Sequence, residues 1–112
     1  MDRLNTLQMV EEYVKSYMDW VANNPKHDYH LMSDKEKGHI QLFKAGFNKE
    51  GKFRFHVVFH FQVKEDGKVW VLVNNTDIEV GIEFMKKGLS NQQIVVGFIS
   101  PKLREHSGYA VA

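Results

Sequence analysis

Histidine is the residue type in this chain that could most readily do chemistry, because six histidines occur in a sequence without cysteine. Imidazole nitrogens bind metal ions and exchange protons near neutral pH. His56 and His60 are expected on one side of a strand, but four residues separate them by about 13 Å, too far to share an ion. His39 can approach His60 across a hairpin, yet two ligands do not complete a metal site. The spacing favours polar or interfacial histidines over a metal centre, with a pH-sensitive contact as an alternative.

Other arrangements that carry catalysis are weak in this sequence. The serines occur in no nucleophile-elbow pattern, and the glycines are scattered singly instead of forming a phosphate-binding loop. The acid pairs at residues 11–12 and 65–66 fall on a helix and a turn, where solvation is enough to explain them. We therefore expect a protein that is not an enzyme and carries no cofactor. A small enzyme of unknown reaction stays as an alternative.

The length and composition describe one ordinary globular domain over residues 1–112. Lysine and arginine number 15 against 14 acids, for a net charge of +1, whereas dedicated nucleic-acid binders usually carry a strong basic stripe. No run reaches the roughly 18 apolar residues of a membrane helix, and the first residues lack the apolar segment of a signal peptide. We expect a cytoplasmic protein that reaches DNA only indirectly and has no membrane partner.

Residues 53–64 are the stretch against which the rest of the chain is expected to fold. The odd positions are all phenylalanine or valine, and the even positions are mostly polar. Alternation of this kind is typical of a strand with one apolar face. We expect one long strand whose odd-numbered side chains, from Phe53 to Val63, all point into the core.

Two hairpins are expected to supply the neighbours of this strand. Residues 48–51 connect it to a preceding strand at residues 39–47, and Asp66-Gly67 is typical of a two-residue turn into residues 69–73. The apolar faces then coincide, and a one-residue slip would reverse them. The expected pairs are Ile40 with Phe59, Leu42 with Val57, Val63 with Trp70, and Phe61 with Leu72.

Helical periodicity predicts two further elements. The first helix has an N-cap at Asp2 and a stop at residues 23–25. The second begins at residues 76–79, where threonine and glutamate are spaced as a capping box. The apolar stripes of the two helices are Leu4, Leu7, Val10, Val14, Met18 and Val21, and Ile78, Ile82, Met85 and Leu89.

The remaining segments are expected to complete the sheet. Residues 27–33 predict a weak strand, and residues 94–99 are apolar on both faces, which favours an interior strand. The apolar residues 109–112 indicate docking onto the domain or onto a partner. These elements predict an α+β fold, in which an N-terminal helix packs on a mainly antiparallel sheet of about five strands. The second helix precedes the last strand.

The sheet face opposite the first helix is the candidate interaction surface. The expected register places histidine, aromatic and aliphatic side chains there, a mixture typical of a protein interface. In the C-terminal segment, a basic residue could contact an anion or an acidic partner, or simply be solvated, and a tyrosine begins the apolar tail. The candidate partner-binding residues are His39, Phe43, His56, Val58, His60, Arg104 and Tyr109.

Several short motifs, taken in order, carry a family resemblance. Those of the last third are Thr76-Asp77-Ile78, Gly81-Ile82-Glu83, Gly88, Gln93-Ile94-Val95-Val96, Phe98, Pro101, Arg104 and the ending at residues 109–112. Those further upstream are Gln41-Leu42, Gly46-Phe47, and His60 followed by Asp66-Gly67-Lys68-Val69-Trp70-Val71. In this order and spacing the chain resembles the XisI family, the fdxN-element excision controlling factors of cyanobacteria.

The resemblance implies a role in programmed excision of a DNA element during heterocyst differentiation. It also implies a partner, the nuclease-like protein XisH, and it brings no established catalytic residue with it. We therefore expect an accessory or regulatory protein that binds a protein partner and that also self-associates. A DNA-binding accessory factor is the alternative from another class.

Overall fold

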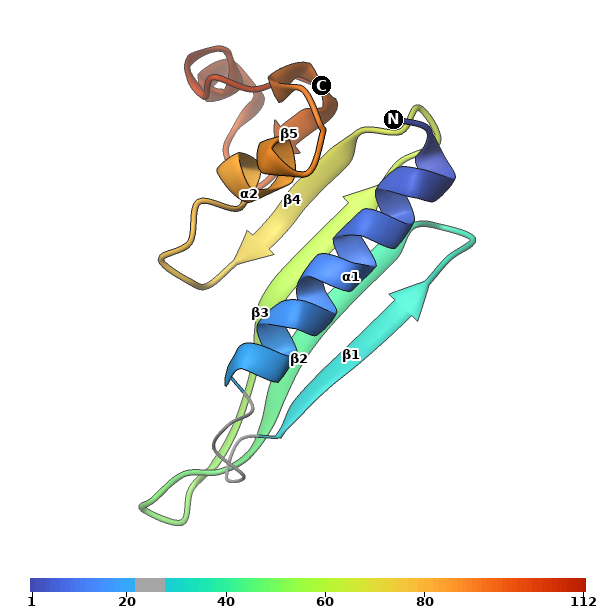
Figure 1. Cartoon of the computed structure of the whole chain (residues 1–112). Helices are drawn as coiled ribbons and strands as arrows, with labels where there is room; N and C mark the ends of the chain where they lie inside the picture. The colour runs from blue at the N-terminus through green and yellow to red at the C-terminus, as the bar shows by residue number, and fades with distance from the viewer. Residues whose placement is uncertain (22–27) are drawn as a thin grey trace.

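The computed structural model describes residues 1–21 and 28–112, and it has the expected α+β architecture. A five-stranded sheet has the order β1-β2-β3-β4-β5, antiparallel except for the parallel pair β4 and β5 (Figure 1). The elements are α1 (Arg3–Val21), β1 (Tyr29–Asp34), β2 (His39–Phe47), β3 (Phe53–Val63), β4 (Val69–Asn74), α2 (Val80–Lys86), η1 (Asn91–Gln93), β5 (Ile94–Val96) and η2 (Pro101–His106).

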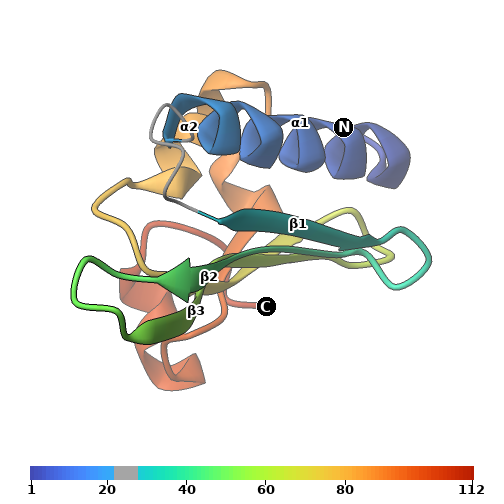
Figure 2. The ribbon, with the colours of Figure 1, turned by 90° about the horizontal axis from the view of Figure 1, so that it is seen from below.

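Helix α1 lies across one face of the sheet, as Figures 1 and 2 show. Its N-cap is confirmed, because the Asn5 backbone N–H donates to the Asp2 carboxylate over 2.8 Å. Leu7, Val10 and Val14 are buried, whereas Leu4 at the start of the predicted stripe is exposed. The predicted helix stop and the first residue of the predicted weak strand lie outside the described residues. Of the helices described, none is long and apolar enough to cross a bilayer.

The core forms between α1, the sheet and α2. Phe59, Phe61 and Phe84 are fully buried. Tyr13 packs edge-on against Phe84 at 5.5 Å and Tyr17 against Phe59 at 4.9 Å, measured between ring centroids. Burial raises the pKa of both tyrosine hydroxyls. Edge-to-face packing of this kind adds to the free energy of burial.

The expected register between β2 and β3 is wrong, and a β-bulge is the reason. Leu42 pairs with Phe59 and Phe43 with Val57, so Val58 is an extra residue on β3. The connection also closes differently than expected, because the Asn48 N–H donates to the Lys52 carbonyl over 2.9 Å, which leaves a three-residue loop at 49–51 and shifts the pairing by one residue. Each irregularity reverses the side-chain alternation once. Together they keep the odd-numbered side chains Phe59, Phe61 and Val63 in the core and turn the odd-numbered side chains Phe53, Phe55 and Val57 to the opposite face.

The turn between β3 and β4 also departs from expectation. The Lys64 N–H donates to the Lys68 carbonyl over 3.0 Å, which leaves a three-residue loop at 65–67. Gly67 has φ +87°, the left-handed conformation that such loops require at this position. The resulting slip pairs Val63 with Val69 and Phe61 with Val71. Trp70 and Leu72 therefore leave the core face on which they were expected.

Helix α2 begins later than the capping box predicted. Glu79 is the residue before the helix and its side chain makes no capping hydrogen bond. The Thr76 hydroxyl instead accepts from the Ile78 N–H over 3.1 Å in a local turn. The helix buries Val80, Gly81 and Phe84. Ile82 and Met85, predicted for the buried stripe, are exposed.

The C-terminal segment docks onto the domain. β5 is shorter than predicted and ends the sheet instead of lying inside it, but its outer side is bridged by Ala110. The Ala110 N–H donates to the Ile94 carbonyl over 2.9 Å. Figure 2 shows this segment on the side of the sheet away from α1, and Figure 1 places it beside β4 and β5. It therefore leaves the corresponding face of β1 and β2 without a helix.

Candidate protein interaction surface

The face of β1, β2 and β3 that points away from α1 is named here the uncovered face. Strand pairing and side-chain contacts bring its members together. None of these residues is among the buried core. The uncovered face consists of His30, Met32, Asp34, His39, Gln41, Phe43, Ala45, Phe47, Phe53, Phe55, Val57, His60 and Gln62.

Aromatic rings form a ladder across the uncovered face. His30 stacks on Phe43 at 4.9 Å, and Phe43 lies 5.2 Å from Phe55. Phe47 and Phe53 meet edge-on at 5.4 Å where the β2–β3 hairpin ends. Phe47, Phe53 and Phe55 are 69%, 58% and 61% exposed. These three side chains alone leave about 380 Å² in water, taking about 200 Å² for a whole ring side chain. An apolar patch of this size is in the range of the largest patch on a monomeric protein, which is often a functional surface.

A histidine pair lies on the same face, beside the aromatic ladder. His39 Nδ1 and His60 Nε2 are 2.9 Å apart, and His60 Nδ1 lies 3.0 Å from the Gln41 amide nitrogen. Because an amide nitrogen can only donate, His60 accepts at Nδ1 and donates from Nε2 to His39. This arrangement requires the His60 ring to be neutral. Burial lowers the pKa of His60, and the neighbouring His39 lowers it further.

The structure brings together three of the predicted candidates and separates two. His39, Phe43 and His60 share the uncovered face. His56 pairs with Lys44 on the other side of the sheet, and Val58 is buried in the core. The expectation that all five share one face is wrong, because the bulge at Val58 reverses the alternation of β3.

Arg104 and Tyr109 lie within the fold and hold the C-terminal segment in place. The Arg104 guanidinium donates to the Gly97 carbonyl over 3.2 Å and stands 5.0 Å from the Trp70 ring centre. The Tyr109 hydroxyl donates to the Glu79 carboxylate over 3.3 Å. Burial raises the pKa of Tyr109, and the charge and hydrogen bond of Glu79 act in the same direction. Both side chains therefore have structural contacts that explain their presence.

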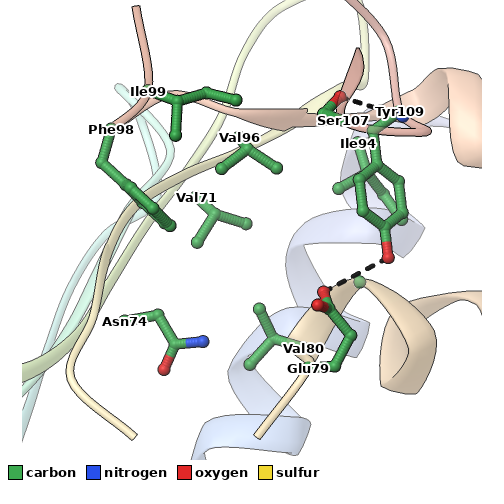
Figure 3. A pocket seen from close by; sticks show the side chains of 11 residues that line it. Val71, Asn74, Glu79, Val80, Ile94, Val96, Phe98, Ile99, Ser107 and Tyr109 are labelled. Carbon is green, nitrogen blue, oxygen red and sulfur yellow. Dashed lines mark hydrogen bonds between the residues drawn. The ribbon is translucent and has the colours of Figure 1, made fainter. Parts of the chain in front are cut away.

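A pocket of about 180 Å³ lies where Tyr109 meets the start of α2 (Figure 3). Its polar side chains already have partners. Asn74 donates to the Ile78 carbonyl, and Ser107 donates to a backbone carbonyl and accepts the Tyr109 N–H. Within residues 1–21 and 28–112, no group of three histidine, cysteine, aspartate or glutamate side chains is placed to hold a metal ion. The pocket therefore offers few groups for substrate or metal.

Sequence reasoning missed the most exposed members of the uncovered face. Phe53 and Phe55 were expected in the core, and His30, Met32 and Phe47 were not singled out. The available signal was the pair Val57-Val58, because two adjacent apolar residues interrupt the alternation of β3. Such an interruption is compatible with a bulge, but it does not by itself distinguish a bulge from regular pairing.

Comparison with known proteins identifies relatives of this architecture. A family model described as XisI protein matches residues 1–111. The chain belongs to the XisI family. An XisI-like protein from Anabaena variabilis has a crystal structure that matches with a TM-score of 0.89 at 26% identity, over 99% of this chain and 100% of that chain. The family resemblance of the sequence motifs is thereby confirmed.

A second solved structure of the XisI family supports the fold. It is the fdxN element excision controlling factor XisI from Anabaena variabilis, with a TM-score of 0.82 at 23% identity. The match covers 99% of this chain and 100% of that chain. Among curated proteins, none matches. The α+β arrangement, with one helix on a mostly antiparallel sheet and a second helix before the last strand, is therefore that of XisI-like proteins.

Proposed function

We propose that this XisI-family protein is a non-catalytic accessory factor that binds a protein partner through the uncovered face. The exposed aromatic ladder is the observation that carries this proposal. Aromatic residues are enriched at the energetic centres of protein interfaces. A sheet face that leaves three phenylalanines largely in water gains most from being covered by another apolar surface.

The family supplies the biological setting of the proposal. One solved relative bears the name fdxN element excision controlling factor. We infer that this chain also acts in the programmed excision of a DNA element, in association with an XisH-like nuclease. The proposal includes self-association of this chain, so that the partner meets more than one copy.

The charge of the uncovered face favours a protein partner over DNA. Its members are aromatic, aliphatic, histidine or glutamine side chains and the acid Asp34, without a lysine or arginine among them. Binding to a nucleic-acid backbone depends on several cationic contacts to phosphates. The basic side chains nearest to it in β2 and β3, Lys44 and Arg54, pair with His56 and Gly46 on the other side of the sheet. DNA would therefore be reached through the nuclease.

The test is titration calorimetry with the XisH-like nuclease from the same organism. Phe55→Glu places a carboxylate in the centre of the aromatic ladder and should weaken binding by at least about 30-fold, the loss expected for an interfacial hot spot. Ile82→Glu is the matched control, because Ile82 is also an exposed apolar residue but lies on α2. It should bind like the wild type.

Three results would contradict the proposal. The first is no detectable binding at micromolar concentration with both proteins folded. The second is equal weakening by Phe55→Glu and Ile82→Glu, which would remove the uncovered face from the interface. The third is tight binding to DNA alone, with an affinity that falls steeply with salt, because this dependence marks direct phosphate contacts.

A further inference from the structure

The two edge strands of the sheet differ in whether their outer side has a backbone partner. The outer side of β5 is bridged by Ala110. Among the residues that the structure describes, no strand pairs with the outer side of β1. Proteins usually protect such an edge with lysine, proline, a bulge or a very short strand. β1 has six residues, Tyr-His-Leu-Met-Ser-Asp, and pairs with β2 without a register shift. It therefore carries none of these protections.

The hydrogen-bonding phase of β1 shows which backbone groups face outward. The Ala45 N–H donates to the Asp28 carbonyl over 2.9 Å, just before β1 begins. In an antiparallel ladder the pairs alternate between hydrogen-bonded and non-hydrogen-bonded. The even residues of β1 therefore direct their N–H and C=O groups toward β2. Leu31 and Ser33 direct theirs toward the outer edge, where a further strand could pair with them.

We propose that β1 pairs with β1 of a second copy, antiparallel and centred on Met32. In this register the outward N–H and C=O groups of Leu31 in one copy pair with those of Ser33 in the other. This agrees with the alternation of inward and outward backbone groups along β1. It places Met32 opposite its own counterpart. It also places His30 of each copy opposite Asp34 of the other, at the about 5 Å separation of cross-strand side chains.

The composition of the strand favours a second copy of this chain as the occupant. Antiparallel pairing of two identical strands is two-fold symmetric, so every contact forms twice and the assembly closes as a dimer. A carboxylate meets an imidazole at both ends of the pairing, and an apolar thioether meets its counterpart at the centre. No like charges are opposed in this register, so the strand is complementary to itself.

Pairing at this edge would also enlarge the uncovered face. His30 and Met32 belong to that face, and His30 stacks on Phe43 at the edge of the aromatic ladder. Across the two-fold axis, the ladders of two copies become parts of one continuous surface. This inference deepens the self-association in the proposed function, while partner binding through the phenylalanines stays a separate property that can be measured independently.

The test measures the oligomeric state of the full chain by sedimentation velocity, at concentrations from about 1 to 200 µM. The wild type should form a dimer within this range. Met32→Lys opposes two ammonium groups at the two-fold axis and should weaken dimerisation by about 100-fold, because opposed like charges cost several kcal/mol. Leu103→Lys is the matched control: the two side chains are 60% and 58% exposed, and Leu103 lies in η2. It should dimerise like the wild type.

Hydrogen exchange of the backbone amides locates the contact. The amides of Leu31 and Ser33 should be protected in the wild-type dimer and should exchange rapidly in Met32→Lys. Ser33→Pro gives a second route, because it removes an outward N–H and no donor to β2. Circular dichroism should show all variants folded. The proposal also expects Ser33→Pro to keep binding the nuclease, because Ser33 pairs with the core residue Ile40 and is not a member of the uncovered face.

Four outcomes would overturn the inference. A wild type that stays monomeric at 200 µM would do so. A dimer that persists in Met32→Lys, or one whose Leu31 and Ser33 amides exchange freely, would place the contact elsewhere. Equal loss of dimerisation in Leu103→Lys would show that the effect of Met32→Lys comes from the added net charge and not from its position on β1. Loss of nuclease binding in Phe55→Glu with an intact dimer would leave this inference standing and locate partner binding on the ladder.

Discussion

The two halves of β3 have the same alternating pattern, but their phenylalanine side chains lie on opposite faces of the sheet. Phe59 and Phe61 are fully buried beneath α1, whereas Phe53 and Phe55 are more than half exposed on the other side of the sheet. The bulge at Val58 separates the two halves. An identical residue type thus serves the core in one half and a surface in the other. A single inserted residue can therefore turn the apolar side of a strand from the core to the exposed face of the sheet.

Phenylalanine truncation in the two halves should give the largest contrast. Phe59→Ala should lower the free energy of unfolding by about 3–5 kcal/mol, because it leaves a cavity in the core. Phe55→Ala should change it by less than about 0.5 kcal/mol, as expected for an exposed position. Urea unfolding followed by circular dichroism measures both. Similar losses for the two variants would mean that the halves do not differ as described.

Truncating the two valines at the bulge should give a smaller difference in unfolding free energy, again with the larger loss at the buried residue. Val58 is buried, and Val58→Ala should cost about 2 kcal/mol of unfolding free energy through lost burial and a small cavity. Val57 is half-buried on the uncovered face, and Val57→Ala should cost less than about 1 kcal/mol. The same urea titration compares them. A larger loss at Val57 than at Val58 would reverse the assignment of the extra residue.

The histidine pair should give the smallest effect, on the pH dependence of stability. The pKa of His60 is lowered in the folded protein, so protonation favours the unfolded state. Stability from this group is complete above its ordinary value of about 6.5 and falls as pH decreases through the lower folded value. The urea midpoint should decline modestly from pH 7 to pH 5, and His60→Gln should flatten that decline. An equal decline in His60→Gln would assign it to other groups.

The architecture could be predicted from the sequence because its signals are local. Asp2 caps α1, residues 39–47 form β2 as expected, and the two hairpins correctly give β2 and β4 as the neighbours of β3. The strand register, and the face of the sheet to which each side chain points, could not be predicted, because loop lengths and bulges determine both. The β2–β3 loop is one residue shorter and the β3–β4 loop one residue longer than its simplest assignment, and Val58 and Leu72 are extra residues with no partner of their own on the neighbouring strand. The expected pairs could not reveal this, because apolar faces coincide in several registers.

The candidate surface was only partly predictable for the same reason. His39 and His60 were expected to meet, and their ring nitrogens are 2.9 Å apart. Phe53 and Phe55 were expected on the opposite face, because alternation without a bulge leaves no other place for them. From the sequence, Arg104 was expected to be solvated or to contact an anion or acidic partner, and Tyr109 to begin a tail that docks onto the domain or onto a partner. Their contacts with Gly97 and Glu79 depend on residues that are distant in the chain or in a turn of irregular geometry.

The most direct test of the central claim compares the phenylalanine rings of β3 by NMR during titration with the XisH-like nuclease. Selective ¹³C labelling of the rings separates Phe53 and Phe55 from Phe59 and Phe61. The account predicts that the signals of Phe53 and Phe55 shift or broaden on binding, while those of Phe59 and Phe61 stay in place. Binding that leaves Phe53 and Phe55 unchanged would contradict the role given to the uncovered face.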